Sequence, residues 1–557
     1  MRHVTASGIV MGVPVGVILL GAVIYPSLVL LWQGFSRAGQ PTLANLFAVL
    51  GEADTWRVLW NSVHVSLWAT AVGGAAGTVL AFAVCRTNLP GRRFFRTALL
   101  LPYLIPPFIG ALAWLALMGP VGFVNQLWMA LTGASEPLFR IYGALGIVLA
   151  LSLYNYPLAY LTVLASLERM DPTLEEAARS SGATPLRMVR DVTLPLVGPA
   201  IGAGAVLIFL SSVANFGIPA ILGFPAKYFV LTTKIYATIL DFDRPHNLSL
   251  AAALSFLLVL AAGVAMGLQR FSVRGRAYGL TRGMGQPILL DLGRWRRRAG
   301  IAVAVFLAIT SVAPVLAILL TSLTRAYGMP LGWDNLTLRN FHNLLFMFPA
   351  VWRSVWNSLI LAASSATVAI LLAVLVAYVQ TRTHLRGKGV LEALVALPFA
   401  VPGTVVALAM ILAFLKPVFG ISLYNTIWII LVAYIARFLA LAVKPIVAAF
   451  TQVHPSLEEA ARSSGATLAR SLRDVTVPLV RPALVAGWFL AAVPAITELT
   501  LSVLLWSVGN ETVGVMVFNM HEEGKVLLSS ALAVVVMGIA LASNLAIRRV
   551  SGGWGGS

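Results

Sequence analysis

Apolar runs long enough to cross a lipid bilayer as helices decide what this 557-residue chain can fold into. A spanning helix needs roughly 20 mostly apolar residues, whereas barrel strands would alternate every second residue over about ten. Only 11% of the residues are charged, against roughly 25% in soluble domains. We therefore expect an all-α polytopic membrane protein with about twelve transmembrane helices, at 8–32, 58–85, 98–118, 143–167, 198–222, 249–270, 300–323, 354–380, 391–415, 424–449, 481–505 and 526–547.

The placement of the basic residues predicts the orientation. With the N-terminus in the cytoplasm, cytoplasmic segments hold 26 of the 39 Lys and Arg residues and outer segments hold 11. Cytoplasmic loops are generally the richer in these residues, so both termini are expected inside. The first run has no small-residue cleavage site after it and reads as an uncleaved span. Topology and anionic membrane lipids account for most of the net charge of +19, which argues against a nucleic-acid partner.

One polar stretch occurs twice, letter for letter. LEEAARSSGAT occupies Leu174–Thr184 and again Leu457–Thr467, and the copies continue as RDVTLPLVGPA at Arg190–Ala200 and RDVTVPLVRPA at Arg473–Ala483. A polar insert that stays identical while the apolar sequence around it diverges is held by something outside the lipid. Both copies fall between the fourth and fifth predicted spans of their half, on the predicted cytoplasmic side.

Shorter matches extend the repeat across the chain. Three pairs share an offset of 296: Trp60-Asn61-Ser62 with Trp356-Asn357-Ser358, Arg86-Thr87 with Arg382-Thr383, and Leu101-Pro102 with Leu397-Pro398. The halves keep the same in/out direction, which is a parallel repeat related by an axis along the membrane normal. We expect a first half at 1–270, a basic cytoplasmic linker at 271–299 and a second half at 300–557.

Each copy of the polar stretch predicts two short helices separated by a turn. Asp171 can cap the first helix with Pro172 in its first turn, and Thr184 can cap the second. Gly182 provides a position that tolerates positive φ between them. In the second copy, His454 replaces the first cap and Gly465 the turn glycine. The expected product is a surface helix-turn-helix that a partner can approach closely.

These residues resemble the EAA loop, which marks permease subunits of binding-protein-dependent ABC importers. The pattern reads Glu176-Ala177-Ala178, Gly182, Val192 and Leu194-Pro195, and again Glu459-Ala460-Ala461, Gly465, Val475 and Val477-Pro478. Both copies have Val where the family usually has Ile. The resemblance covers both halves, with EAA loops at 171–195 and 454–478. Two loops in one chain look like a fused dimer, resembling the ferric-iron importer branch. Thiamine and aminoethylphosphonate importers are close alternatives.

The resemblance implies a transport subunit of the bacterial inner membrane. Its partners would be two ABC ATPase subunits at the loops and an external substrate-binding protein. ATP and Mg²⁺ would be held by the ATPases, and no cofactor by this chain. The residues expected to couple to the ATPases are Glu175, Glu176, Ala177, Ala178, Gly182, Glu458, Glu459, Ala460, Ala461 and Gly465.

The sequence has no phosphate-binding loop of the ATPase type. Gly387-Lys388-Gly389 has neither the upstream glycine nor the following hydroxyl residue that such a loop requires. Energy must then come from a partner or from an ion gradient. A proton-coupled secondary transporter of two parallel halves and a non-transporting scaffold are the alternatives, although neither explains the duplicated loop.

Charged and polar residues inside the spans are candidates for the translocation pathway. Arg437 and Glu498 lie within predicted spans, and their counterparts at an offset of 283 are Tyr154 and Asn215. We expect these four residues to face one another, with Arg437 and Glu498 paired. A purely structural ion pair is the alternative. The seven histidines show no paired metal spacing, so no metal site is predicted.

Overall fold

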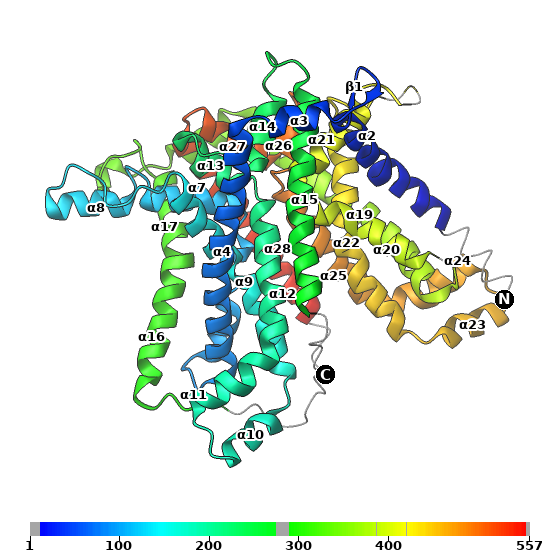
Figure 1. Ribbon diagram of the computed structural model, residues 1–557, viewed down its shortest axis with the longest axis horizontal. Helices are drawn as coiled ribbons and strands as arrows, with labels where there is room; N and C mark the ends of the chain where they lie inside the picture. The colour runs from blue at the N-terminus through cyan, green and yellow to red at the C-terminus, as the bar shows by residue number, and fades with distance from the viewer. Residues whose placement is uncertain (1–11, 274–288, 386, 419, 421, 553–557) are drawn as a thin grey trace. The chain divides into compact units, whose positions relative to one another are not determined.

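The computed structural model describes residues 12–273, 289–385, 387–418, 420 and 422–552 (Figure 1). Among these residues, eleven helices are long and apolar enough to cross a membrane, or up to twelve if a pair bent by 105° counts as one span. They also form one small antiparallel hairpin, β1 (Ser36–Arg37) with β2 (Gln40–Pro41). The prediction of an all-α polytopic protein is confirmed.

The first half contains seventeen helical elements in the described residues. They are η1 (Leu20–Ile24), α2 (Tyr25–Gly34), α3 (Ala44–Leu50), α4 (Ala53–Arg86), α5 (Arg92–Ala98), α6 (Leu101–Leu104), α7 (Pro107–Met118), α8 (Phe123–Thr132), α9 (Ala144–Arg169), α10 (Pro172–Ser180), α11 (Pro185–Met188), η2 (Val189–Thr193), α12 (Leu194–Val213), α13 (Gly217–Gly223), η3 (Phe224–Ala226), α14 (Leu231–Ile239) and α15 (Asn247–Val273).

The second half repeats the lengths of two long helices in the first half: α4 and α19 each have 34 residues, and α9 and α22 each have 26. Its elements are η4 (Gly293–Trp295), α16 (Arg296–Leu307), η5 (Ala308–Val312), α17 (Ala313–Ser322), η6 (Trp333–Asn335), α18 (Arg339–Phe346), α19 (Pro349–Arg382), α20 (Lys388–Ala400), α21 (Gly403–Phe414), α22 (Ile427–Gln452), α23 (Pro455–Ser463), α24 (Leu468–Ser471), η7 (Leu472–Thr476), α25 (Val477–Ile496), α26 (Ser502–Leu505), α27 (Val513–Glu522) and α28 (Val526–Gly552).

In the part of the chain that the structure describes, four of the predicted spans are broken rather than continuous: 98–118, 198–222, 391–415 and 481–505. Two of the breaks come from proline, which pushes the preceding residue out of the helical region. Ile105, before Pro106, has ψ 130°, and Val401, before Pro402, has ψ 139°. Hydropathy measures only how apolar a segment is, so it could not locate these breaks.

Packing divides the chain into two compact units that do not follow chain order. Unit 1 comprises Met1–Val49, Thr238–Phe256 and Phe341–Ser557, and unit 2 comprises Leu50–Ala237 and Leu257–Asn340. Within unit 1, α2 packs against α21 of the second half, and within unit 2, α17 packs against α7 of the first half. The halves 1–270 and 300–557 therefore describe the sequence repeat. In the packed units, the first span of each half lies with the other half. Of the predicted linker at 271–299, residues 274–288 lie outside the described residues.

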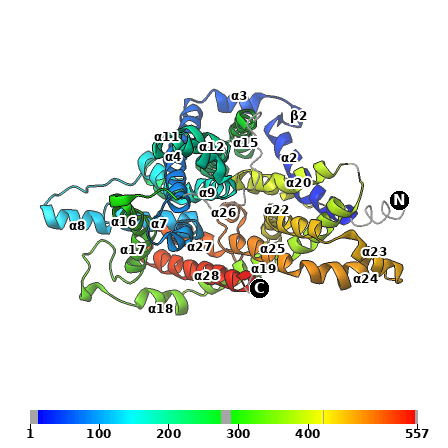
Figure 2. The ribbon, with the colours of Figure 1, turned by 90° about the horizontal axis from the view of Figure 1, so that it is seen from below.

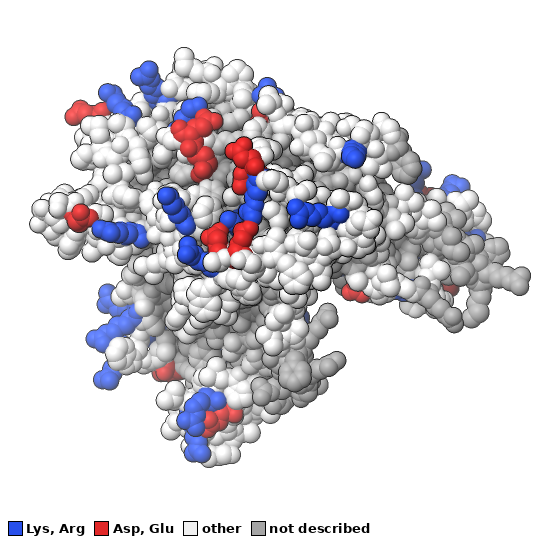
Figure 3. Space-filling view, turned by 45° about the horizontal axis from the view of Figure 1, so that its top comes forward, with Lys and Arg blue, Asp and Glu red and all other residues white. Residues whose placement is uncertain are grey.

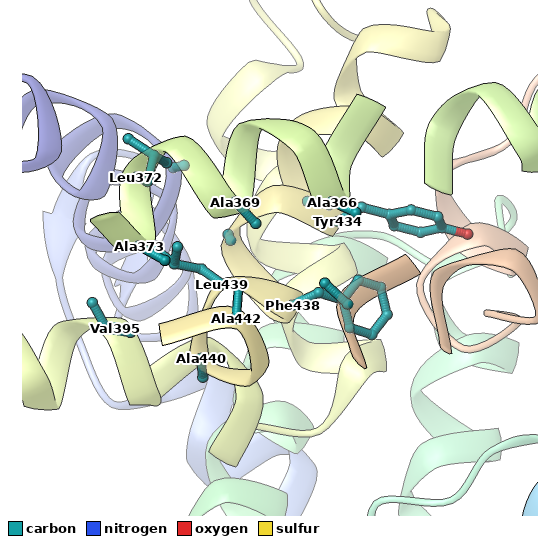
Figure 4. Close-up of a cluster of buried hydrophobic side chains, with 14 of the residues drawn as sticks. Ala366, Ala369, Leu372, Ala373, Val395, Tyr434, Phe438, Leu439, Ala440 and Ala442 are labelled. Atoms are coloured by element: carbon teal, nitrogen blue, oxygen red, sulfur yellow. The ribbon is translucent and has the colours of Figure 1, made fainter. Parts of the chain in front are cut away.

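Small residues let the long helices pack closely. In unit 1, Ala366, Ala369 and Ala373 of α19 lie in one buried cluster with side chains of α22 (Figure 4). In unit 2, a Cβ added at Gly77 of α4 would lie 2.5 Å from the main-chain oxygen of Tyr156 in α9. Glycine and alanine at such contacts are typical of helices that associate in lipid.

Large apolar side chains are exposed along the long helices. Trp56, Trp60 and Trp68 on α4 are each more than half exposed, and over the face in Figure 3 charged residues are sparse and gathered in groups. An apolar surface of this extent needs a lipid environment.

The repeated Trp-Asn-Ser sequence has a structural role in both units. In unit 2, Asn61 donates to a carbonyl of the loop before α14, and Ser62 Oγ accepts from the N–H of Leu231 at 2.7 Å. In unit 1, Asn357 and Ser358 make the same contacts at the start of α27. These hydrogen bonds fix the N-terminal ends of α14 and α27 to the long helices α4 and α19.

Candidate functional site

The polar repeat folds in both units as two short helices, α10 with α11 and α23 with α24. Figure 1 shows α10 and α11 at the end of unit 2, and Figure 2 shows α22 leading into α23 and α24. Asp171 accepts from the N–H of Thr173 at 3.0 Å, and His454 Nδ1 accepts from that of Ser456 at 3.3 Å. The structure thus confirms the two predicted first caps, which satisfy otherwise unpaired N–H groups at each helix start.

The turns between the short helices match in both units. Gly182 has φ +83° and Gly465 has φ +90°, and each N–H donates to the carbonyl three residues earlier. No atom lies within 4 Å of a Cβ built at either glycine. Glycine is therefore required by the left-handed backbone and not by lack of space. Both turns are exposed.

Hydroxyl caps start the second short helices. Thr184 Oγ1 accepts from the N–H of Arg187 at 3.4 Å, and Thr467 Oγ1 from that of Arg470 at 3.3 Å. Each helix then passes through a five-residue π-helical turn, η2 or η7, before the long helices α12 and α25 begin. A π-helical turn inside a helix is uncommon and is frequently found at functional sites.

The predicted coupling residues divide between an outer and an inner face. Glu176, Ala177, Glu459 and Ala460 are exposed, as are both turn glycines, whereas Ala178 and Ala461 are half-buried. Two leucines add apolar surface, since Leu174 is 45% exposed and Leu457 is 47% exposed. The outer face therefore combines carboxylates, small side chains and one leucine in each copy, which suits a groove on a protein partner.

Glu175 and Glu458 lie on the inner face, so neither is available to a partner in this conformation. In unit 2, Glu175 lies 3.2 Å from Nη1 of Arg86, and both side chains are 1% exposed. The hydroxyl of Thr193, in η2, donates to Glu175 Oε1 at 2.9 Å. Arg86 also donates from Nη2 to the carbonyl of Leu167, near the end of α9.

Unit 1 contains the same three residue types in the same places. Arg382 Nε donates to Glu458 Oε1 at 3.0 Å, and the side chains are 8% and 9% exposed. Thr476 in η7 donates to the same oxygen at 2.9 Å, and Arg382 Nη2 donates to the carbonyl of Val453 at 2.7 Å. We refer to Arg86, Glu175 and Thr193, and to Arg382, Glu458 and Thr476, as the two Arg–Glu–Thr clusters.

The arginines and threonines of these clusters were not among the predicted site residues. The sequence did contain their signal, because Arg86-Thr87 recurs as Arg382-Thr383 and both threonines belong to the repeated RDVT. Nothing in the sequence indicated that these separate matches meet in space.

Arg437 and Glu498 bind main-chain groups instead of each other. Arg437 Nη1 donates to the carbonyls of Pro398 and Val401, at 3.3 and 3.0 Å, where α20 ends at the bend. Glu498 Oε1 accepts from the N–H of Leu501 at 2.9 Å, in the break between α25 and α26. The predicted ion pair is therefore wrong, because the broken helices offer unpaired carbonyl and N–H groups that these side chains satisfy.

In unit 2 the counterparts are neutral. Asn215 Oδ1 accepts from the N–H of Ile218 at 3.0 Å, as Glu498 does at the equivalent break. Tyr154 stacks on Tyr103 of α6, with ring centroids 5.4 Å apart. Asn215, Arg437 and Glu498 thus hydrogen-bond to the backbone at helix breaks, with charged side chains in unit 1 only, whereas Tyr154 packs on the short helix before a break.

Within the described residues, no three His, Cys, Asp or Glu side chains are grouped so that they could hold a metal ion.

A family model and curated relatives indicate the same kind of protein for this chain. The family model described as "Binding-protein-dependent transport system inner membrane component" matches residues 73–278 and 369–552. The ferric transport system permease protein FbpB of Actinobacillus pleuropneumoniae is 27% identical over 538 residues, covering 93% of this chain and 75% of that protein. The putative ferric transport system permease protein FbpB 1 of Haemophilus influenzae is 27% identical over 505 residues, covering 88% and 76%.

Among solved structures, a bacterial alginate ABC transporter in complex with an alginate pentasaccharide-bound periplasmic protein is similar with a TM-score of 0.41 and 20% identity. The match covers 48% of this chain and 93% of that one.

Proposed function

The chain belongs to the family of binding-protein-dependent transport system inner membrane components, and we propose that it is the permease of an ATP-driven importer whose substrate is ferric iron. The two curated relatives described above are ferric transport permeases that align with most of the chain. The alignments span both repeats of this chain, which supports the interpretation that both permease halves are fused here.

The observation that carries the mechanism is the duplicated, exposed turn between capped helices. We propose that one ATPase subunit binds the outer face of α10 and a second binds that of α23. ATP and Mg²⁺ would act on those partners, so this chain itself catalyses no hydrolysis. Closure of the ATPases then favours one of two permease conformations because they bind its loops differently in each.

Substrate enters from an external binding protein, and both chain termini lie in the cytoplasm. In this proposal Tyr154, Asn215, Arg437 and Glu498, which lie at or beside helix breaks, line the translocation pathway. Breaks of this kind are tolerated at membrane depth where the backbone faces protein or a water-filled cavity.

Crosslinking tests the ATPase assignment. The native Cys85 is replaced by Ala, and single cysteines are placed at Ala177 or Ala460, both exposed on the loops. Each variant should capture an ATPase that co-purifies at about two copies per chain. A cysteine at Val508, which is 89% exposed between α26 and α27, is the matched control and should capture none.

A transport assay tests whether ferric iron is the substrate. Proteoliposomes holding the purified complex, with its binding protein, should accumulate ferric iron only when ATP is supplied. Accumulation of thiamine or aminoethylphosphonate instead would overturn the iron assignment. Accumulation driven by a proton gradient without ATP would overturn the importer mechanism, and absence of any transport would support a scaffold.

A further inference from the structure

The two Arg–Glu–Thr clusters are buried charge at the junction between the loops and the long helices. In unit 2, Arg86 and Glu175 are each 1% exposed and Thr193 is fully buried. Burying ionised groups is costly unless each finds a partner of opposite charge and further hydrogen bonds. Here Glu175 forms an ion pair with Arg86 and accepts a hydrogen bond from the Thr193 hydroxyl, and Arg86 also donates to a main-chain carbonyl.

Each cluster joins four elements that are otherwise separate in the chain. In unit 2 these are the last residue of α4, the end of α9, the first turn of α10 and the turn η2 before α12. In unit 1 the corresponding elements are α19, α22, α23 and η7. The short helix that carries the exposed loop is therefore tied directly to three of the long helices of its unit.

The two clusters have the same residue types and share the Thr-to-Glu and Arg-to-carbonyl hydrogen bonds, but they differ in the contact between Arg and Glu. Arg382 Nε donates to Glu458 in unit 1. Among the described residues of unit 2, Arg86 Nε, Arg86 Nη1 and Glu175 Oε2 are buried without a hydrogen-bond partner, although Nη1 and Oε2 are only 3.2 Å apart. Buried unsatisfied groups mark a place where strain can be held.

From this geometry we propose that Glu175 and Glu458 are positioning residues that make each loop helix and its long helix move as one body. Displacing α10 without α4 would leave Arg86 and Glu175 as separated charges in a dry environment, which is the costly state. Movement of the loop is therefore passed to α4, α9 and α12, and in unit 1 to α19, α22 and α25. This inference rests on the proposed function, since it assigns a role to the loops that the ATPases would bind.

The test compares Glu175→Gln and Glu458→Gln in the complete complex. The amide keeps the size of the side chain and removes its charge. The measured quantity is substrate imported per ATP hydrolysed in proteoliposomes, together with the amount of ATPase that co-purifies. Coupling between sites generally corresponds to factors of 5 to 150, so we expect each variant to lower the import-to-hydrolysis ratio by at least about fivefold while the complex still assembles.

Glu168→Gln is the matched control, because Glu168 forms an exposed ion pair with Arg96 at the end of α9 and its loss should leave the ratio unchanged. Thr193→Val provides a milder change that removes one hydroxyl and leaves the ion pair, in case Glu175→Gln fails to fold. It should lower the ratio in the same direction.

Import and hydrolysis falling in parallel would mean that the clusters act only on stability, and would overturn the inference. Absence of the ATPase from wild-type complexes would instead overturn the proposed function, so the two failures are distinguishable.

Discussion

Replacing the two turn glycines with valine should abolish import without unfolding the chain. Gly182 and Gly465 have φ +83° and +90°, and no atom lies within 4 Å of an added Cβ. The cost is therefore backbone strain alone, about 1–2 kcal/mol for each left-handed residue. A change of 1–2 kcal/mol shifts a conformational equilibrium by about 5–30-fold, yet is below a typical folding stability of about 5–15 kcal/mol.

The strain is confined to the turn that sets the angle between the two short helices of each loop. We expect Gly182→Val and Gly465→Val to insert into the membrane normally, and the double variant to lose import and substrate-stimulated ATP hydrolysis. The assay is ATP-dependent uptake in proteoliposomes, with detergent-extracted yield and thermal unfolding measured in parallel.

Two matched variants separate backbone strain from other causes. Gly182→Asn should retain most activity, because asparagine tolerates positive φ. Gly202→Val, on α12, also adds a side chain to open space but in helical backbone and should be nearly neutral. Full import by the double valine variant, or equal losses with asparagine and valine, would refute the reasoning.

Three further predictions concern the helix breaks, the packing of unit 2 and the segment before α16. Arg437→Gln shortens the side chain that donates to two carbonyls at the bend between α20 and α21. It should reduce uptake and lower the stability of the fold by about 1.5–3 kcal/mol per lost charged hydrogen bond. An unaltered melting temperature would contradict the bracing role. Gly77→Ala should destabilise the detergent-solubilised chain by about 1–3 kcal/mol because its methyl group overlaps the backbone of α9. Gly74→Ala is the control and should not destabilise the chain, since its Cβ has open space around it. Equal melting temperatures for the two variants would exclude the contact at Gly77. The N–H of Gly293, and then the Asn88 side chain, lower the pKa of Asp291. A carboxylate with a lowered folded pKa stabilises the fold above its ordinary pKa of about 3.9, and that contribution is lost as pH falls through the lowered value. The melting temperatures of wild type and Asp291→Ala should therefore differ at pH 7 and converge in acid; a constant difference would refute this.

Much of the candidate site could be predicted from the sequence because its signals are local. Caps, turn glycines and short amphipathic helices depend on a few consecutive residues, so the caps Asp171 and His454 and the turn positions of Gly182 and Gly465 were predicted correctly. The pairing of Arg437 with Glu498 failed, because it assumed continuous spans. Once the helices break, their free carbonyl and N–H groups compete for these side chains.

The order of residues is enough to predict that the chain crosses a membrane many times, that its two halves are repeats and that each half contains a capped polar loop. These properties depend on hydropathy and on short motifs, which act over one or two helical turns. The folded structure was needed to show that the first span of each half packs on the other half, that four spans are broken within the described residues, and that Glu175 and Glu458 face inward to buried arginines. Those outcomes depend on contacts between residues far apart in the chain, where the cost of burying a charge or an unpaired backbone group selects the partner.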